Sequence, residues 1–199
     1  MEDYQSFNLS IDPSIQDLAD EVLNGEEVKH AENITETLFW DGHRDHAIKA
    51  LQDLIGRTPK RPVYYLNNEI GRLPEETRDV IRYAGDFVDQ IIKYCAHEKG
   101  SYFFKFQAFR HSLGPNLKKL KGVLPDDLIE KLRKFNDLIY VQAKHSWEVG
   151  SRPHLFSAAE AVLVCFIVKK FANDILPFSV EAQWYSENKM YNYHNTDPS

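Results

Sequence analysis

The most strongly apolar stretch of the chain, residues 156–176, has the pattern of a buried helix. Ser157 and Glu160 stand three residues apart at its start, which is the spacing of an N-terminal capping box. Apolar residues then cover more than one face of the helix, so we expect it to lie near the centre of a bundle. Pro177 is expected to end the helix, because proline cannot continue its hydrogen bonding.

A second long helix is predicted from Pro74 to about Gly100, where apolar residues recur at spacings of three and four. Farther along, we expect a short basic helical turn over residues 115–121 and then a Val-Leu-Pro break. An amphipathic segment follows from Pro125 and leads to His145. The aromatic run at 102–109 is interpreted as core packing, with base stacking as the alternative.

The first 73 residues carry weaker helical patterns. Asp12-Pro13 is typical of a helix start and Asn24-Gly25 of a helix end. A further helical stretch is expected from about Asn33 to Ile55, with Gly42 as a candidate break. Residues 59–73 are interpreted as extended chain or as a loop packed by its tyrosines.

Together these patterns predict an all-α protein, a helical bundle of about four main helices over residues 74–178. An acidic helical extension over 1–73 precedes the bundle, and an aromatic tail over 179–199 follows it. With 199 residues, 43% of them hydrophobic, the chain can bury a sizeable core. Cys95 and Cys165 lie in apolar helical patterns and are expected to be small buried hydrophobes; a disulfide between them is the alternative.

Charge is distributed unevenly along the chain, whose net charge is -6. Residues 1–41 contain eleven acids and one base, whereas residues 105–134 contain eight bases and three acids. The acidic N-terminal residues and the basic middle are expected to attract each other, or the basic residues are expected to bind phosphates. The alternative is that the basic residues simply form a solvated helix face. The N-terminus has no apolar leader, and no apolar run is long enough to span a bilayer. We therefore expect a cytoplasmic protein without a membrane partner.

Several short motifs follow one another in a recognisable order over residues 76–178. A long helix carries Arg82, Asp86 and Asp89 on its polar side. It is followed by Leu117-Lys118-Lys119-Leu120-Lys121-Gly122, Leu124-Pro125-Asp126-Asp127-Leu128, Phe135-Asn136, Ala143-Lys144-His145 and Phe156-Ser157-Ala158-Ala159-Glu160-Ala161. This order resembles the HEPN superfamily, small helical bundles found in prokaryotic toxins, in CRISPR and other defence effectors and in nucleotidyltransferase-associated proteins. The resemblance implies a bundle that pairs as a homodimer.

Active HEPN proteins cleave RNA without a metal, using an Arg and a following His, and the resemblance implies His145 and Asn136 as the catalytic candidates. Phe135 precedes Asn136 where the Arg is expected, and no histidine here has an arginine five to seven positions before it. Our leading hypothesis is a module with a degenerate nuclease motif that binds RNA or a protein partner in a prokaryotic defence or toxin-antitoxin context. The alternatives are a metal-independent endoribonuclease using His145, and an interaction protein acting through its acidic N-terminal arm.

Basic and histidine side chains near these motifs are the candidate binding residues, because fixed positive charge attracts phosphates. They are Arg110, His111, Lys118, Lys119, Arg133, Lys144, Arg152 and His154. Scattered surface residues are the alternative account of this set. For His145 the alternative is a structural hydrogen bond to the backbone where the helix breaks.

His43 and His46, with Asp41 and Asp45, are the one group that resembles metal ligands. Histidines three residues apart can share a helix face and bind one ion together with a carboxylate. The group lacks a His-Glu-x-x-His signature, and the chain has no Cys-x-x-Cys or glycine-rich phosphate loop. We therefore predict neither a metal nor a cofactor and interpret the group as an exposed polar helix start.

Overall fold

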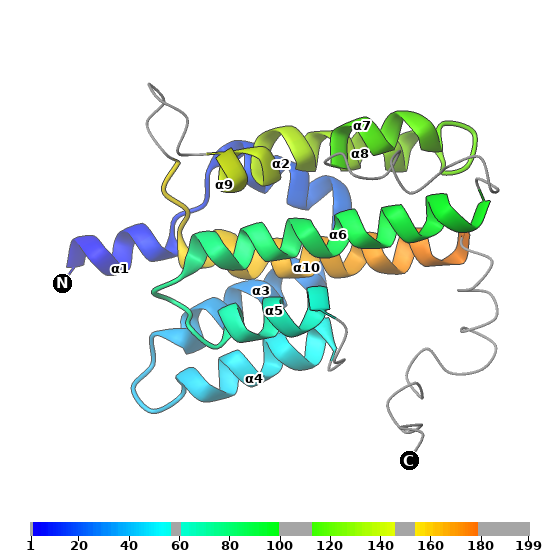
Figure 1. Ribbon diagram of the computed structural model, residues 1–199. Helices are drawn as coiled ribbons and strands as arrows, with labels where there is room; N and C mark the ends of the chain where they lie inside the picture. Colours follow the sequence, from blue (N-terminus) through cyan, green and yellow to red (C-terminus); the bar gives the residue numbers. More distant parts are fainter. Residues whose placement is uncertain (1, 57–60, 100–112, 146–153, 179–199) are drawn as a thin grey trace, which may run out of the picture.

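The computed structural model describes residues 2–56, 61–99, 113–145 and 154–178. Within these ranges the regular elements are helices and no β-strand forms, so the predicted all-α fold is confirmed (Figure 1). The helices are α1 (Glu2–Leu9), α2 (Pro13–Val22), α3 (Gly25–Leu38), α4 (Arg44–Ile55), α5 (Arg61–Ile70), α6 (Thr77–Lys99), α7 (Leu113–Leu117), α8 (Asp126–Phe135), α9 (Val141–His145) and α10 (Ala158–Ile175). Short 3-10 turns cover Lys118–Leu120 and Leu176–Phe178, and a π-helical turn, Asn136–Tyr140, joins α8 to α9.

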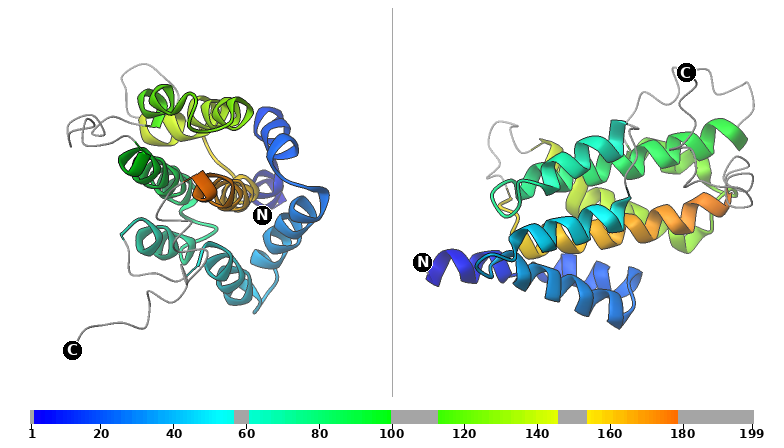
Figure 2. Two further views of the ribbon diagram at one scale, coloured as in Figure 1. Left: turned by 90° about the vertical axis from the view of Figure 1, so that its right-hand side faces the viewer. Right: turned by 90° about the horizontal axis from the view of Figure 1, so that it is seen from below.

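Helix α10 lies at the centre of the bundle, as its apolar pattern predicts. The left view of Figure 2 shows it ringed by the other helices, and it packs most extensively against α6 and α3. The capping box at its start is also confirmed: Ser157 Oγ accepts a hydrogen bond from the Glu160 amide at 3.1 Å, and Glu160 Oε2 accepts one from the Ser157 amide at 2.9 Å. Helix α10 ends at Ile175, two residues before Pro177.

The helices before residue 74 share one hydrophobic core with those after it. Ile15 and Leu18 of α2, Leu51 of α4 and Leu66 of α5 are fully buried in the same cluster as the α6 and α10 side chains. The acidic N-terminal segment also meets the basic middle of the chain, because Lys134 of α8 donates to Glu21 of α2 at 2.7 and 2.9 Å. The expected attraction between these two regions is therefore present for this pair.

Two local expectations for the N-terminal half were wrong. The segment interpreted as extended or loop forms α5, in which Val63, Leu66 and Ile70 are buried at helical spacings. Its proline stands in the first turn, where the missing amide hydrogen costs nothing. The second stretch begins at Gly25 and not near Asn33, because Asn24 starts a second capping box. The break at Gly42, which has φ +77°, is confirmed.

The helices of the described ranges include none with the length and apolarity that a membrane crossing requires.

Candidate functional site

A row of polar side chains crosses the packing between α6 and the neighbouring layer of α7, the π-helical turn and α9. Most other side chains of the core around α10 are apolar, with Ser157 and Glu160 at the start of α10 among the buried polar exceptions. Polar groups at such a boundary need hydrogen-bond partners, because an unpaired buried polar atom costs about 1–3 kcal/mol. We refer to this row as the polar seam: Asp86, Asp89 and Lys93 of α6, Asn116 of α7, Asn136 and Tyr140 of the π-helical turn, and Lys144 of α9.

Tyr140 is the centre of the polar seam. Its side chain is fully buried, and its hydroxyl donates to Asp86 Oδ1 at 2.5 Å. Its ring covers Gly85 so closely that a Cβ there would lie 2.0 Å from the ring. Burial and the hydrogen bond to Asp86 raise the pKa of Tyr140 far above its ordinary value, while Arg82 acts in the opposite direction. Tyr140 therefore remains a neutral hydroxyl and is not a nucleophile near neutral pH.

Lys144 extends the polar seam to the surface. Its Nζ donates to the Tyr140 hydroxyl oxygen at 3.2 Å and lies 5.0 Å from the centre of the Tyr140 ring, a cation-π distance. At the start of α6, about two turns before Asp86, Arg78 Nε donates to the backbone carbonyl of Ala143 at 2.9 Å. These contacts fix α9, and with it the backbone of His145, against the N-terminal half of α6.

Asp89 lies at the inner end of the polar seam and is only 4% exposed. Burial raises the pKa of its carboxyl group, and the ion pair with Lys93 opposes that shift. Asn116 Nδ2 lies 3.5 Å from the other carboxylate oxygen. This end of the polar seam is thus a buried carboxylate that is balanced by one cation.

Asn136, one of the two catalytic candidates, is 7% exposed and begins the π-helical turn. Its Nδ2 donates to Asp137 Oδ1 at 2.7 Å, whereas its buried Oδ1 has no hydrogen-bond partner within the described part of the chain. Such turns occur often at functional sites. Asn136, Tyr140 and Lys144 follow one another at intervals of four residues along this helical stretch, so they lie toward one side, with Tyr140 between the other two.

Beside the polar seam, an aromatic cluster connects α5 to α6. The rings of Tyr64 and Tyr65 meet edge to face at 5.7 Å, and Tyr65 stacks on Tyr83 of α6 at 5.6 Å with 21° between the ring planes. The guanidinium of Arg82 lies 4.6 Å from the centre of the Tyr83 ring. Tyr64 is 54% exposed and Tyr65 42%. We call these four side chains the tyrosine ladder; sequence reasoning missed them, since only the helical conformation of α5 brings its tyrosines to α6.

The remaining candidates are dispersed or lie outside the described residues. Lys118 is exposed beside α7, and Arg133 of α8 pairs with Glu130 at 3.6 Å. The side chains of Lys119 and His145 lie outside the described part of the chain, as do Arg110, His111 and Arg152 altogether. The structure therefore brings Asn136 and Lys144 into one row and leaves Arg133 on another helix, where an acid already pairs with it.

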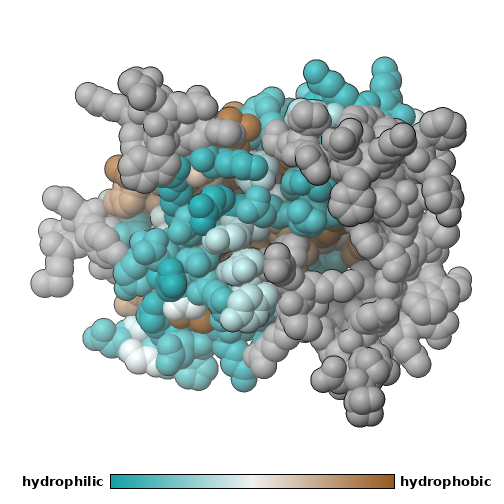
Figure 3. All heavy atoms as spheres, viewed as in Figure 1, coloured by the Kyte–Doolittle hydropathy of each residue, from teal (hydrophilic) through white to brown (hydrophobic). Residues whose placement is uncertain are grey.

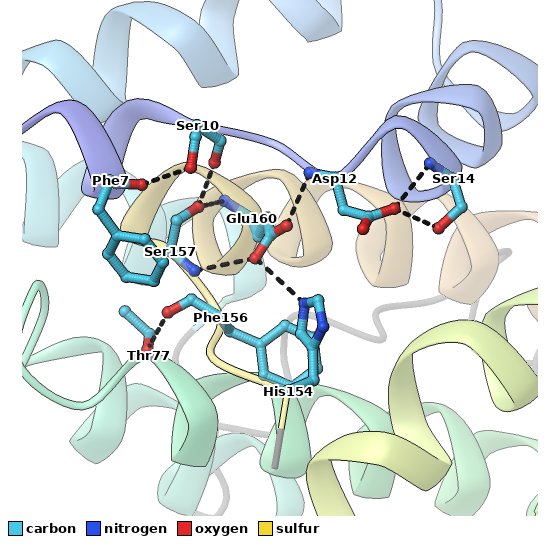
Figure 4. Close-up of polar contacts among 9 residues, drawn as sticks. All are labelled: Phe7, Ser10, Asp12, Ser14, Thr77, His154, Phe156, Ser157 and Glu160. Atoms are coloured by element: carbon cyan, nitrogen blue, oxygen red, sulfur yellow. Dashed lines mark hydrogen bonds and ion pairs between the residues drawn. The ribbon is translucent and has the colours of Figure 1, made fainter. Parts of the chain in front are cut away.

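His154 belongs to a different junction, at the start of α10 (Figure 4). Its Nε2 lies 3.8 Å from Oε2 of Glu160, a carboxylate that is only 3% exposed. Glu160 also accepts from the Asp12 amide at 2.8 Å, and Ser157 Oγ donates to the carbonyl of Ser10. This geometry indicates a structural role for His154, since the junction ties the chain before α2 to α10.

His43 and His46 lie at the exposed start of α4 with ring centres 5.7 Å apart. Among the residues with described positions, no three His, Cys, Asp or Glu side chains converge as metal ligands would. Cys165 is a free, buried thiol, and its burial raises its pKa to about 12.

No protein-family model, curated protein or solved structure significantly matches this chain. The resemblance to the HEPN superfamily, with the homodimer and the partners that it implies, therefore stays a prediction.

Proposed function

We propose that this chain is a helical module that binds single-stranded RNA, and that the tyrosine ladder stacks the bases. The observation that carries the proposal is the exposure of Tyr64 and Tyr65 in a stacked row that ends on Arg82. Aromatic rings on a protein surface bind single strands by stacking, which contributes about 1–3 kcal/mol per base and tolerates any sequence. The four side chains of the ladder already pack against one another, so they lose little conformational freedom when a ligand binds.

The surroundings of the ladder favour a nucleic acid over a protein partner. The side of the molecule on which α5 and α6 face the viewer is mainly hydrophilic over the described residues, with only small hydrophobic patches (Figure 3). Protein interfaces more often present a larger continuous apolar patch. Positive charge near the ladder comes from Arg82, which also pairs with Asp79 at 3.2 Å, and from Lys144, whose ammonium lies over the Tyr140 ring on which Arg82 acts electrostatically. Charge of this kind offsets the acidic balance of the whole chain for a ligand that carries phosphates.

The test is the binding of a short fluorescent single-stranded RNA, measured by anisotropy with EDTA present. Tyr64→Ala and Tyr65→Ala are each expected to weaken binding by about 1–3 kcal/mol. Trp40→Ala is the matched control, because Trp40 is a 59% exposed aromatic residue at the turn between α3 and α4. Equal losses in all three variants, or no RNA binding by the wild-type protein, would contradict the proposal.

The same assay separates the enzyme from the binding module. Cleavage of the RNA in the presence of EDTA, abolished by His145→Ala, would identify the metal-independent endoribonuclease. Intact RNA that remains bound would support the module with a degenerate nuclease motif. We further propose a cytoplasmic location. The resemblance supports a homodimer in a prokaryotic defence or toxin-antitoxin setting, and light scattering on the purified protein tests its oligomeric state.

A further inference from the structure

Lys144 contacts a tyrosine, whereas several other lysines of the fold form ion pairs with carboxylates. Lys93, Lys134 and Lys170 each pair with a carboxylate. Within the described residues Lys144 forms no ion pair; its ammonium rests on the Tyr140 hydroxyl and ring instead. A carboxylate in direct contact neutralises a lysine, whereas a hydroxyl orients it without forming an ion pair. Asp89 attracts Lys144 only as a longer-range charge.

Asp86 explains why the hydroxyl accepts from Lys144. The single hydrogen of the Tyr140 hydroxyl is donated to Asp86 Oδ1, so the remaining lone pairs are free to accept from the ammonium. Tyr140 is itself fixed, because its buried ring lies directly against Gly85. The chain Asp86–Tyr140–Lys144 therefore runs from a rigid helix to an exposed cation.

We propose that Lys144 is a pre-positioned phosphate-binding residue, oriented by Tyr140 and Asp86, and that it holds the RNA backbone beside the tyrosine ladder. The RNA as source of the phosphate rests on the function proposed above. Arg82 connects the two parts of this surface, since it lies over Tyr83 of the ladder and acts electrostatically on Tyr140. A lysine that is already ordered loses less side-chain freedom on binding than a mobile one.

The test compares RNA affinity over a range of salt concentrations for four proteins and one control. Lys144→Ala is expected to weaken binding and to reduce the slope of log Kd against log salt by about 0.7, the value for one phosphate contact on a single strand. Lys144→Arg should retain the slope. Tyr140→Phe keeps the ring but releases the ammonium toward the half-buried Asp86 carboxylate, and should weaken binding about twofold to tenfold. Lys49→Ala removes an exposed lysine of α4, a helix that packs against α3 and α5, and should change neither quantity.

The double variant separates positioning from a general structural role. If Tyr140 acts through Lys144, Tyr140→Phe has no further effect on binding in the Lys144→Ala background. An equal loss in both backgrounds, or an unchanged salt slope in Lys144→Ala, would overturn the inference. Urea denaturation of each variant shows whether the fold is retained.

Inorganic polyphosphate distinguishes this inference from the proposed function, because it offers phosphates without bases. Lys144→Ala and Tyr140→Phe should weaken its binding, while Tyr64→Ala and Tyr65→Ala should not. Polyphosphate binding that depends on Lys144, without RNA binding, would refute the RNA function and support the phosphate site. Polyphosphate binding that is indifferent to Lys144 would refute the site whatever the RNA result.

Discussion

Replacing Gly85 with alanine is expected to displace Tyr140 and to destabilise the protein substantially. The added Cβ would lie 2.0 Å from Tyr140 Cδ2 and 2.6 Å from Cε2, well inside van der Waals contact. Tyr140 is fully buried, so its ring has to move into occupied space. That movement also breaks the hydrogen bond from its hydroxyl to Asp86.

The size of the effect follows from three contributions to the free energy of unfolding. Overpacking a core costs about 1–3 kcal/mol. Loss of a hydrogen bond to a charged group costs about 1.5–3 kcal/mol. Alanine returns about 1 kcal/mol through its better helix propensity. Gly85→Ala should therefore lower the free energy of unfolding by about 1.5–5 kcal/mol, the sum of these three contributions.

Urea denaturation followed by circular dichroism measures this change. Gly25→Ala is the control, since a Cβ at Gly25 meets nothing within 4 Å, and it should stay within about 0.5 kcal/mol of the wild type. In a Tyr140→Ala background the clash is absent, so Gly85→Ala should no longer destabilise. A loss below about 0.5 kcal/mol in the wild-type background, or the same loss in both backgrounds, would refute the reasoning.

Three further predictions concern buried ionisable groups. Burial raises the pKa of Asp89 above its ordinary 3.8, so the wild type should lose stability relative to Asp89→Asn as the pH rises above that value. Urea denaturation over a pH series measures the difference, and a relative gain would contradict the prediction. Burial raises the pKa of Cys165 from 9.0 to about 12. Between pH 9 and pH 12 the free energy of unfolding of the wild type should therefore fall, relative to that of Cys165→Ala, by up to about 1.4 kcal/mol per pH unit. A stability difference that does not depend on pH would contradict this prediction. Glu160→Ala leaves the Asp12 and Ser157 amides unpaired and should lower the thermal midpoint by an amount corresponding to about 2–4 kcal/mol. The control Glu27→Ala, in the exposed capping box of α3, should cost about 1 kcal/mol or less. Equal shifts in the two variants would show that burial of the capping carboxylate does not matter.

Features that depend on neighbouring residues were predicted well from the sequence. The capping box of Ser157 and Glu160, the apolar pattern of α10 and the break at Gly42 all involve residues within one or two turns of each other. Helix α5 was missed because its proline and tyrosines are typical of a loop. Three apolar side chains, Val63, Leu66 and Ile70, decide its conformation by packing into the core.

The sequence by itself determined an all-helical protein with α10 at its centre, and it singled out Asn136 and Lys144. Only the tertiary structure decided what these residues contact. Tyr140 meets Asp86 across 54 positions of the chain, and Tyr65 stacks on Tyr83 of the next helix. Hydrophobic periodicity specifies which face of a helix is buried, but it does not specify the partner helix or the register against it. Close packing sets that register, and it is the register that joins the polar seam to the tyrosine ladder.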